Sequence, residues 1–283
     1  MSVPALPAAT VIVLRDAEPD GVDTYMVKRP ARTRFLPNAH VFPGGRVEAQ
    51  DEDPAWLPFC GVRHRAVAPP VATLAHGIAA IRELFEEAGL LLVRSRDGWL
   101  PGTDTWWPAS DLHDIREALI AGTTTFLPVC QREGWQPALD LLTPLSRWIT
   151  PEIEPRRFDT VFYVAAAPPG QDAQVDGREA VSGAWFRPAD GVAKYLAGEI
   201  SLVPPTLRTL EDLSDLSSCR AAIDRAVASR VCTILPRLLV ERGTQWLLLP
   251  GDPLFPAAPD STMPPPTRFV LEAGRWRSAP APE

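Results

Sequence analysis

The chain has 283 residues, a length that fits one enlarged domain better than two separate ones. Hydrophobic residues make up 46% and charged residues 22%, values close to globular averages, so a wholly disordered chain is excluded. The 32 prolines and 18 glycines predict many loops and exclude a long coiled coil. A formal net charge of −7 argues against a surface that binds nucleic acid or anionic lipid as a whole.

The cysteines and the hydropathy pattern indicate an intracellular protein. The four cysteines lie far apart without a CxxC pair, which favours reduced thiols over a zinc site or a disulfide scaffold. No apolar stretch reaches the roughly 18 residues of a membrane span. We therefore expect a soluble, cytoplasmic protein.

The N-terminal half predicts a strand hairpin followed by one clear helix. Residues 73–88 keep one flank apolar at helical spacing, Thr73 can cap the start, and Gly89 can supply a left-handed end. The strands expected in this half, from β-branched and aromatic runs, are residues 10–14, 24–29 and 90–93.

The C-terminal half alternates between helical and strand patterns. Two or three short helices are expected within 111–142. Expected after them are strands at 157–167 and 184–187, helices at 190–197, 205–213 and 217–229, a hairpin within 235–249, an extended proline-rich segment at 250–266 and a frayed tail at 278–283.

Three carboxylates share one face of the expected helix. Glu83, Glu86 and Glu87 stand at positions i, i+3 and i+4, so their like charges lie within one turn. Glutamates on a helix surface are usually only solvated. A divalent cation would make the cluster favourable, and hard carboxylate oxygens select magnesium, manganese or calcium over zinc.

Two segments together resemble the signature of the Nudix hydrolases: FPGGRVE at 42–48 and RELFEEAGL at 82–90. The second segment matches every fixed position of the signature's second half. The glutamate of the first half falls on Asp51, and 30 residues rather than seven separate Asp51 from Arg82. Such a split resembles the subgroup that includes the animal peroxisomal coenzyme A diphosphatase.

The resemblance implies an α/β fold, a Nudix-type α/β/α sandwich with a mixed β-sheet, a helical insert and a C-terminal extension. We expect a Nudix hydrolase domain at 1–231, with an insertion in the signature at 52–75 and the helical insert at 110–142, followed by a proline-rich extension at 232–283. The insertion is equally compatible with a lid over the substrate and with a surface loop.

The resemblance also assigns site residues. It implies that Glu83, Glu86 and Glu87 hold Mg²⁺, with Mn²⁺ as the alternative, and that Glu83 and Glu86 are catalytic. Arg82 is expected to orient a glutamate, and Asp51 to be structural, with Glu52 as the fallback. A distal acidic residue, as base or ligand, is expected before a late strand with a tryptophan. The residue chosen for this distal role is Glu179, and the alternatives are Glu152 and Glu154.

A basic segment precedes and includes the glycine pair. Between Lys28 and Arg46 there are five basic residues and no acid, in a protein of net charge −7. A solvated basic loop is the alternative. The position of two arginines before the glycine pair resembles, in part, a coenzyme-A-associated motif of Nudix diphosphatases. The residues expected to bind substrate are Arg29, Arg34, Gly44, Gly45 and Arg46.

These observations predict an Mg²⁺-dependent hydrolase of a nucleoside diphosphate derivative, with coenzyme A or acyl-CoA as the leading substrate. The alternatives are hydrolysis of ADP-ribose or a dinucleotide such as NADH, and a non-catalytic nucleotide-sensing module. A small nucleotide-derived substrate is the expected partner, a homodimer is considered, and neither nucleic acid nor membrane is expected to bind.

Overall fold

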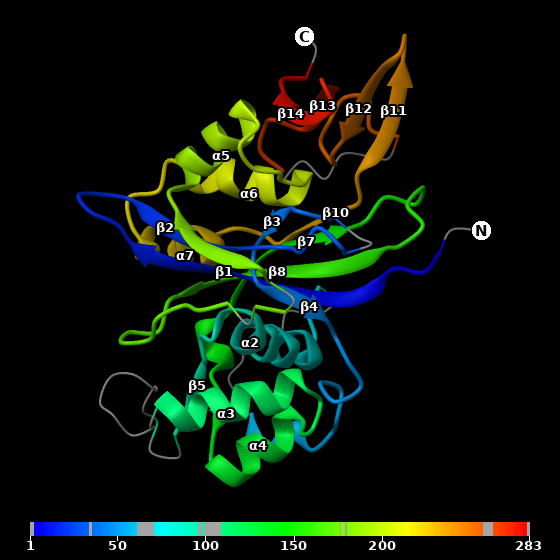
Figure 1. Ribbon diagram of the computed structural model, residues 1–283. Helices are drawn as coiled ribbons and strands as arrows, with labels where there is room; N and C mark the ends of the chain where they lie inside the picture. The colour runs from blue at the N-terminus through cyan, green and yellow to red at the C-terminus, as the bar shows by residue number, and fades with distance from the viewer. Residues whose placement is uncertain are drawn as a thin grey trace.

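The computed structural model describes residues 3–33, 36–60, 71–95, 98, 109–175, 177–178, 180–256 and 263–281. In this part of the chain a central mixed sheet lies between two helical layers (Figure 1). Its strands run in the order β10-β7-β8-β1-β2-β3, with β4 paired to β1 and β9 to β2. The strands are β1 (Leu6–Asp16), β2 (Val22–Lys28), β3 (His40–Val41), β4 (Gly44–Arg46), β7 (Thr143–Ile149), β8 (Phe158–Ala166), β9 (Ser182–Phe186) and β10 (Cys232–Ile234).

Strand β1 explains why the sheet is covered on both faces. It pairs in parallel with β8 and antiparallel with β2. Because side chains alternate along a strand, Val11 and Val13 enter one core cluster, and Ile12 and Leu14 enter the other. All four side chains are fully buried. The two clusters are therefore the cores of the two helical layers.

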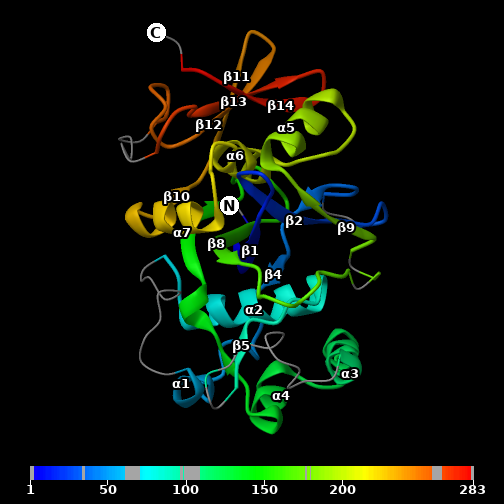
Figure 2. The same cartoon turned by 90° about the vertical axis from the view of Figure 1, so that its left-hand side faces the viewer.

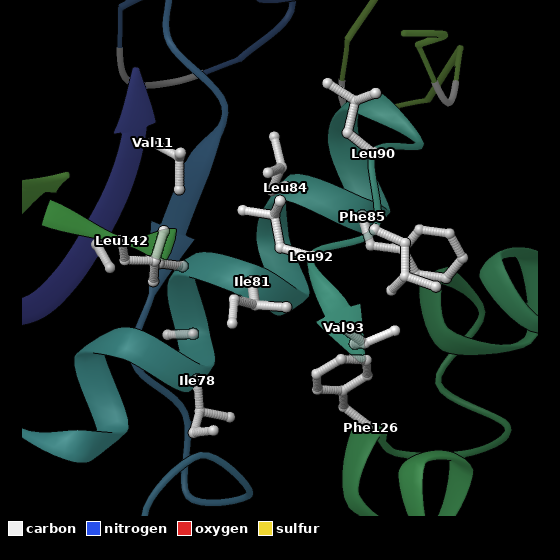
Figure 3. Close-up of a cluster of buried hydrophobic side chains, with 14 of the residues drawn as sticks. Val11, Ile78, Ile81, Leu84, Phe85, Leu90, Leu92, Val93, Phe126 and Leu142 are labelled. Atoms are coloured by element: carbon white, nitrogen blue, oxygen red, sulfur yellow. The ribbon is translucent and has the colours of Figure 1, made fainter. Parts of the chain in front are cut away.

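The lower layer of Figure 1 carries helix α2 (Leu74–Ala88) directly beneath the sheet. Its N-terminus is capped by Thr73, and it ends at Gly89, whose φ of 69° is left-handed, so both predicted caps are confirmed. Its apolar flank, with Ile78 and Leu84, packs toward Val11 and the neighbouring helices (Figure 3). The other elements of this layer are α1 (Trp56–Phe59), β5 (Val93–Arg94), α3 (Ala109–Ile120), α4 (Phe126–Glu133), β6 (Gln136–Pro137) and a 3₁₀ turn at Leu139–Leu141.

The first part of the signature insertion belongs to the lower core. Trp56 is fully buried, its ring lies 5.7 Å from that of Phe126, and its indole N–H donates to the carbonyl of Gln50. The insertion thereby packs against the helical insert. Whether it also acts as a lid stays open, because residues 61–70 lie outside the described part.

The upper layer joins three helices to a second sheet formed by the C-terminal segment. Figure 2 shows this sheet at the end of the molecule opposite α3 and α4. The buried guanidinium of Arg208 donates to the carbonyls of Pro264 and Pro266, and thereby fastens the proline-rich segment to a helix. The elements are α5 (Pro188–Ala197), α6 (Pro204–Leu213), α7 (Cys219–Ala228), β11 (Arg237–Glu241), β12 (Thr244–Leu248), β13 (Arg268–Glu272) and β14 (Arg275–Ala279).

Two of the expected elements are wrong. Residues 90–93 are not a strand of the main sheet, since only Val93 enters a two-residue strand, and Leu90 to Leu92 are buried in the lower core. The backbone of Leu91 is bonded to the Gln171 side chain instead of a neighbouring strand. The tail is not frayed from Ser278, because this residue belongs to β14 and its hydroxyl donates to Glu211.

The division at residue 231 stays a prediction. Strand β10, just after it, pairs with β7 at the edge of the main sheet, so the segment that follows residue 231 contributes a strand to that sheet. Among the helices of the described ranges, none is both long and apolar enough to cross a bilayer.

Candidate active site

The carboxylates of α2 face the glycine pair of β4. The backbone N–H of Gly44 donates to Oε2 of Glu87 at 2.9 Å. The carboxylate of Glu83 lies directly against the Cα of Gly45, in the space that a Cβ would occupy. Any side chain at position 45 would therefore displace Glu83, which explains why this strand needs glycine where it meets the helix.

Hydrogen bonds of Arg82 connect the two halves of the split signature in space. Its Nε and Nη2 donate to the two oxygens of Asp51 at 3.0 and 2.8 Å. Its Nη1 donates to Glu83 at 2.8 Å and to Glu86 at 3.2 Å, and Nη2 also reaches the carbonyl of Arg46 at 3.0 Å. Arg82 and Asp51 are 2% and 1% exposed. The guanidinium of Arg82, which Asp51 anchors in the protein interior, thus orients two of the three glutamates.

The electrostatics of the site follow from this burial. Burial, together with the carboxylates of Glu48 and Asp51, raises the pKa of Glu86 to about 7, although Arg82 opposes the rise. Burial alone would lower the pKa of Arg82, but Asp51, Glu83 and Glu86 hold it above its usual value. The cluster therefore holds more negative charge than one guanidinium balances.

Glu48 is a neighbour of the cluster that sequence reasoning missed. Its charge acts on Glu86, its backbone N–H donates to Asp51 at 2.8 Å, and Gln50 donates to its carboxylate. The sequence feature that could have indicated Glu48 is its position in the FPGGRVE segment, three residues after Gly45.

The donor set fits a divalent cation by its chemistry. Carboxylate oxygens are the ligands that Mg²⁺ and Mn²⁺ prefer, and excess negative charge favours a cation. Within the described ranges, however, no three acidic, histidine or cysteine side chains already converge on one point. Glu83 and Glu86 are turned to Arg82, and Glu87 to Gly44, so these carboxylates would have to share their oxygens with the ion.

The helical insert contacts the same region from below. Arg116 of α3, which is 8% exposed, donates from Nε and Nη2 to the carbonyl of Glu86 at 3.1 and 2.9 Å. Its Nη2 also donates to the carbonyl of Gln174 at 2.8 Å. The insert therefore fixes the last turn of α2 relative to the loop that precedes β9.

The structure does not bring every expected residue to the site. Glu152 is exposed and pairs with Arg237 at 3.1 Å. Arg46 presents its backbone to Arg82, while its side chain is exposed. Arg29 follows β2, and its Nε is buried without a hydrogen-bond partner among the described residues. Glu52 and Glu154 are exposed, and Arg34 and Glu179 lie outside the described residues.

Comparison with known protein families identifies the family to which this site belongs. The family model described as the NUDT19 Nudix domain matches residues 62–213, more than half of the chain and including all of α2. This chain belongs to the NUDT19 Nudix domain family. It is a Nudix hydrolase, and enzymes of this family act on nucleotide-derived substrates and generally need a divalent metal ion.

Two relatives and one solved structure extend the match beyond the family segment. The acyl-coenzyme A diphosphatase NUDT19 of Gallus gallus is 34% identical over 290 residues, covering 86% of this chain and 75% of the relative. The protein of the same name from Homo sapiens is 28% identical, covering 83% and 73%. A NUDIX hydrolase from Alicyclobacillus acidocaldarius superposes with a TM-score of 0.67 at 25% identity, covering 78% of this chain and 96% of that structure. The expected α/β Nudix fold is confirmed.

Proposed function

We propose that this Nudix hydrolase cleaves the diphosphate bond of coenzyme A or an acyl-CoA. The products would be adenosine 3′,5′-bisphosphate and phosphopantetheine or its acyl derivative. The observation that carries the proposal is the 34% identity to a protein named acyl-coenzyme A diphosphatase over 86% of this chain. We propose Mg²⁺ as the metal ion, with Mn²⁺ as the alternative.

The residues of α2 prepare the site for an anionic diphosphate. Glu83, Glu86 and Glu87 would hold the cation, and Arg82 orients the first two of them. A divalent cation supplies, when bound, neutralisation of diphosphate charge and activation of a water. Because Arg82 is itself locked by Asp51, it is unsuited to contact substrate and acts as a positioning residue.

The base that accepts the proton of the attacking water is proposed to be Glu179. In sequence Glu179 comes five residues after Gln174, whose carbonyl accepts a hydrogen bond from Arg116, and Arg116 also donates to the carbonyl of Glu86 near the end of α2. Glu152 is a weaker alternative because it pairs with Arg237 of the C-terminal sheet. Replacement of Glu179 by glutamine should lower kcat more than KM, whereas Glu152→Gln should leave kcat unchanged.

A screen of purified protein with Mg²⁺ or Mn²⁺ against coenzyme A, acetyl-CoA, ADP-ribose and NADH tests the substrate. Product identification by mass spectrometry should show adenosine 3′,5′-bisphosphate from the first two. AMP from ADP-ribose or NADH at a higher kcat/KM would replace the proposal with the alternative hydrolase. Binding without turnover of any substrate would favour the nucleotide-sensing module.

A homodimer and a cytoplasmic location complete the proposal. Sedimentation analysis tests the assembly, and fractionation of cells that produce the protein tests the location.

A further inference from the structure

Strand β11 forms one edge of the C-terminal sheet, whose order is β11-β12-β13-β14. Figure 1 shows β11 on the outer side of this sheet. It joins β12 through Arg242 and Gly243, whose φ values of 51° and 83° match a two-residue type I′ turn. The two strand residues that flank such a turn, Glu241 and Thr244, point their backbone N–H and C=O groups at each other. Because this direction alternates along a strand, the backbone groups of Leu238 and Val240 point away from β12, out of the sheet.

The side chains of β11 continue an apolar face that this chain covers only in part. The register places Leu238 opposite Leu247, and Leu247 opposite Phe269. Leu247 and Phe269 are buried in the upper core, whereas Leu238 and Val240 are 36% and 60% exposed. At Leu238 this face is therefore core on the inner strands, whereas nearer the turn Val240 lies opposite the exposed Gln245, and among the described residues the face is only partly covered along the edge strand. An exposed apolar edge of this kind is a template for pairing with another strand.

The charges of β11 make it complementary to itself. The strand reads Arg237-Leu238-Leu239-Val240-Glu241, with opposite charges at its two ends. If two copies pair antiparallel about a two-fold axis at Leu239, Arg237 lies opposite the partner subunit's Glu241, and this contact occurs twice. Leu238 then lies opposite the partner subunit's Val240, and their outward backbone groups exchange hydrogen bonds.

We propose that β11 pairs with β11 of a second copy of this chain, which joins the two C-terminal sheets into one continuous sheet. The contact is isologous and closes after two subunits, so it produces a dimer and not a fibre. A single strand pair is a small interface, so the dimer should dissociate on dilution. The inference gives the proposed homodimer an interface and does not depend on the substrate.

Sedimentation velocity of the full chain, from about 1 to about 200 μM, should show the mass rise from 30.9 kDa toward twice this value. Val240→Lys should keep the protein monomeric throughout, because it places a charge in each aliphatic pair. R237E and E241R should each weaken association by at least about tenfold, since each opposes like charges at both ends of the strand pair. The double variant R237E/E241R should restore it.

Glu152→Gln is the matched control, because it removes the ion pair that Arg237 makes within its own chain and leaves the β11 edge intact. It should associate like the wild type. A wild-type protein that stays monomeric up to the highest concentration would overturn the proposal, as would a double variant no better than the single ones. Thermal unfolding of each variant verifies folding, and coenzyme A hydrolysis, measured separately, tests the activity whatever the assembly.

Discussion

Asp51 accepts two hydrogen bonds from Arg82, 31 positions further along the chain, and both side chains are almost completely buried. The insertion therefore separates the two halves of the Nudix signature in sequence and not in space. The pair also explains why Asp51, shorter than the expected glutamate, suffices, since its backbone lies close enough for bidentate contact.

Breaking this pair should strongly destabilise the protein. Asp51→Asn removes the bidentate carboxylate partner of the buried guanidinium, which then keeps only its contacts with Glu83 and Glu86, so we expect the free energy of unfolding to fall by about 2 kcal/mol. Urea denaturation in the absence of metal measures the change. The control is Glu199→Gln, which removes an exposed pair with Lys194 and should cost less than about 0.5 kcal/mol. Equal effects of the two substitutions would contradict the orienting role.

Removing a carboxylate from the cluster should lower the activity without lowering the stability of the metal-free protein. Glu86→Gln and Glu87→Gln should each lower kcat by about a hundredfold or more, because each removes negative charge from the proposed metal site. The metal-free protein should hold or gain stability, since repulsion among the carboxylates decreases and glutamine can still accept the Gly44 N–H. Calorimetric titration with Mn²⁺ should show weakened binding. Glu133→Gln on α4 is the control, and near wild-type rates in both cluster variants would remove the metal assignment.

The sequence predicted the local features better than the long-range ones. Helix α2 and both of its caps follow from the 3.6-residue pattern and from Thr73 and Gly89. Strand β7 was missed because Pro144 and its polar residues interrupt the alternation, and partners on both sides, β8 and β10, stabilise it. The contact of Arg82 with Asp51 required the fold, because no local pattern shows which residues an insertion leaves adjacent. The same holds for Arg116 and the end of α2.

His76 should make the protein less stable in acid. Its Nδ1 accepts a hydrogen bond from the backbone N–H of Thr73 at the start of α2, which requires the unprotonated nitrogen. Burial, followed by the charge of Arg147, lowers the pKa of His76 below 6.5, although Asp159 and Glu52 oppose this. The unfolded chain then binds the proton more readily, so stability is complete above pH 6.5 and decreases as the pH falls through this value.

The loss attributable to His76 cannot exceed about 1.4 kcal/mol per pH unit. Thermal unfolding from pH 7.5 to pH 5 should show this slope in the wild type. His76→Gln should flatten it, whereas replacement of the exposed His113 by glutamine should not. The same slope in the wild type and His76→Gln would show that another group is responsible.

Arg29 should distinguish coenzyme A from its analogue without the 3′-phosphate. Its buried Nε has no hydrogen-bond partner among the described residues, as expected of a donor that awaits an anionic ligand. The diphosphate is served by the proposed cation, so the extra phosphate needs its own cationic partner. Arg29→Ala should therefore raise KM for coenzyme A about tenfold at little cost in kcat, and Arg34→Ala should do the same.

Dephospho-coenzyme A should be hydrolysed by these variants almost as well as by the wild type, because it lacks the phosphate they are proposed to bind. Arg32→Ala is the matched control, since this arginine belongs to the same basic segment and is exposed. It should leave both KM values near those of the wild type. Equal losses on the two substrates in Arg29→Ala would mean that the guanidinium binds the diphosphate or supports the loop, and specificity for coenzyme A would then have to come from residues outside this segment.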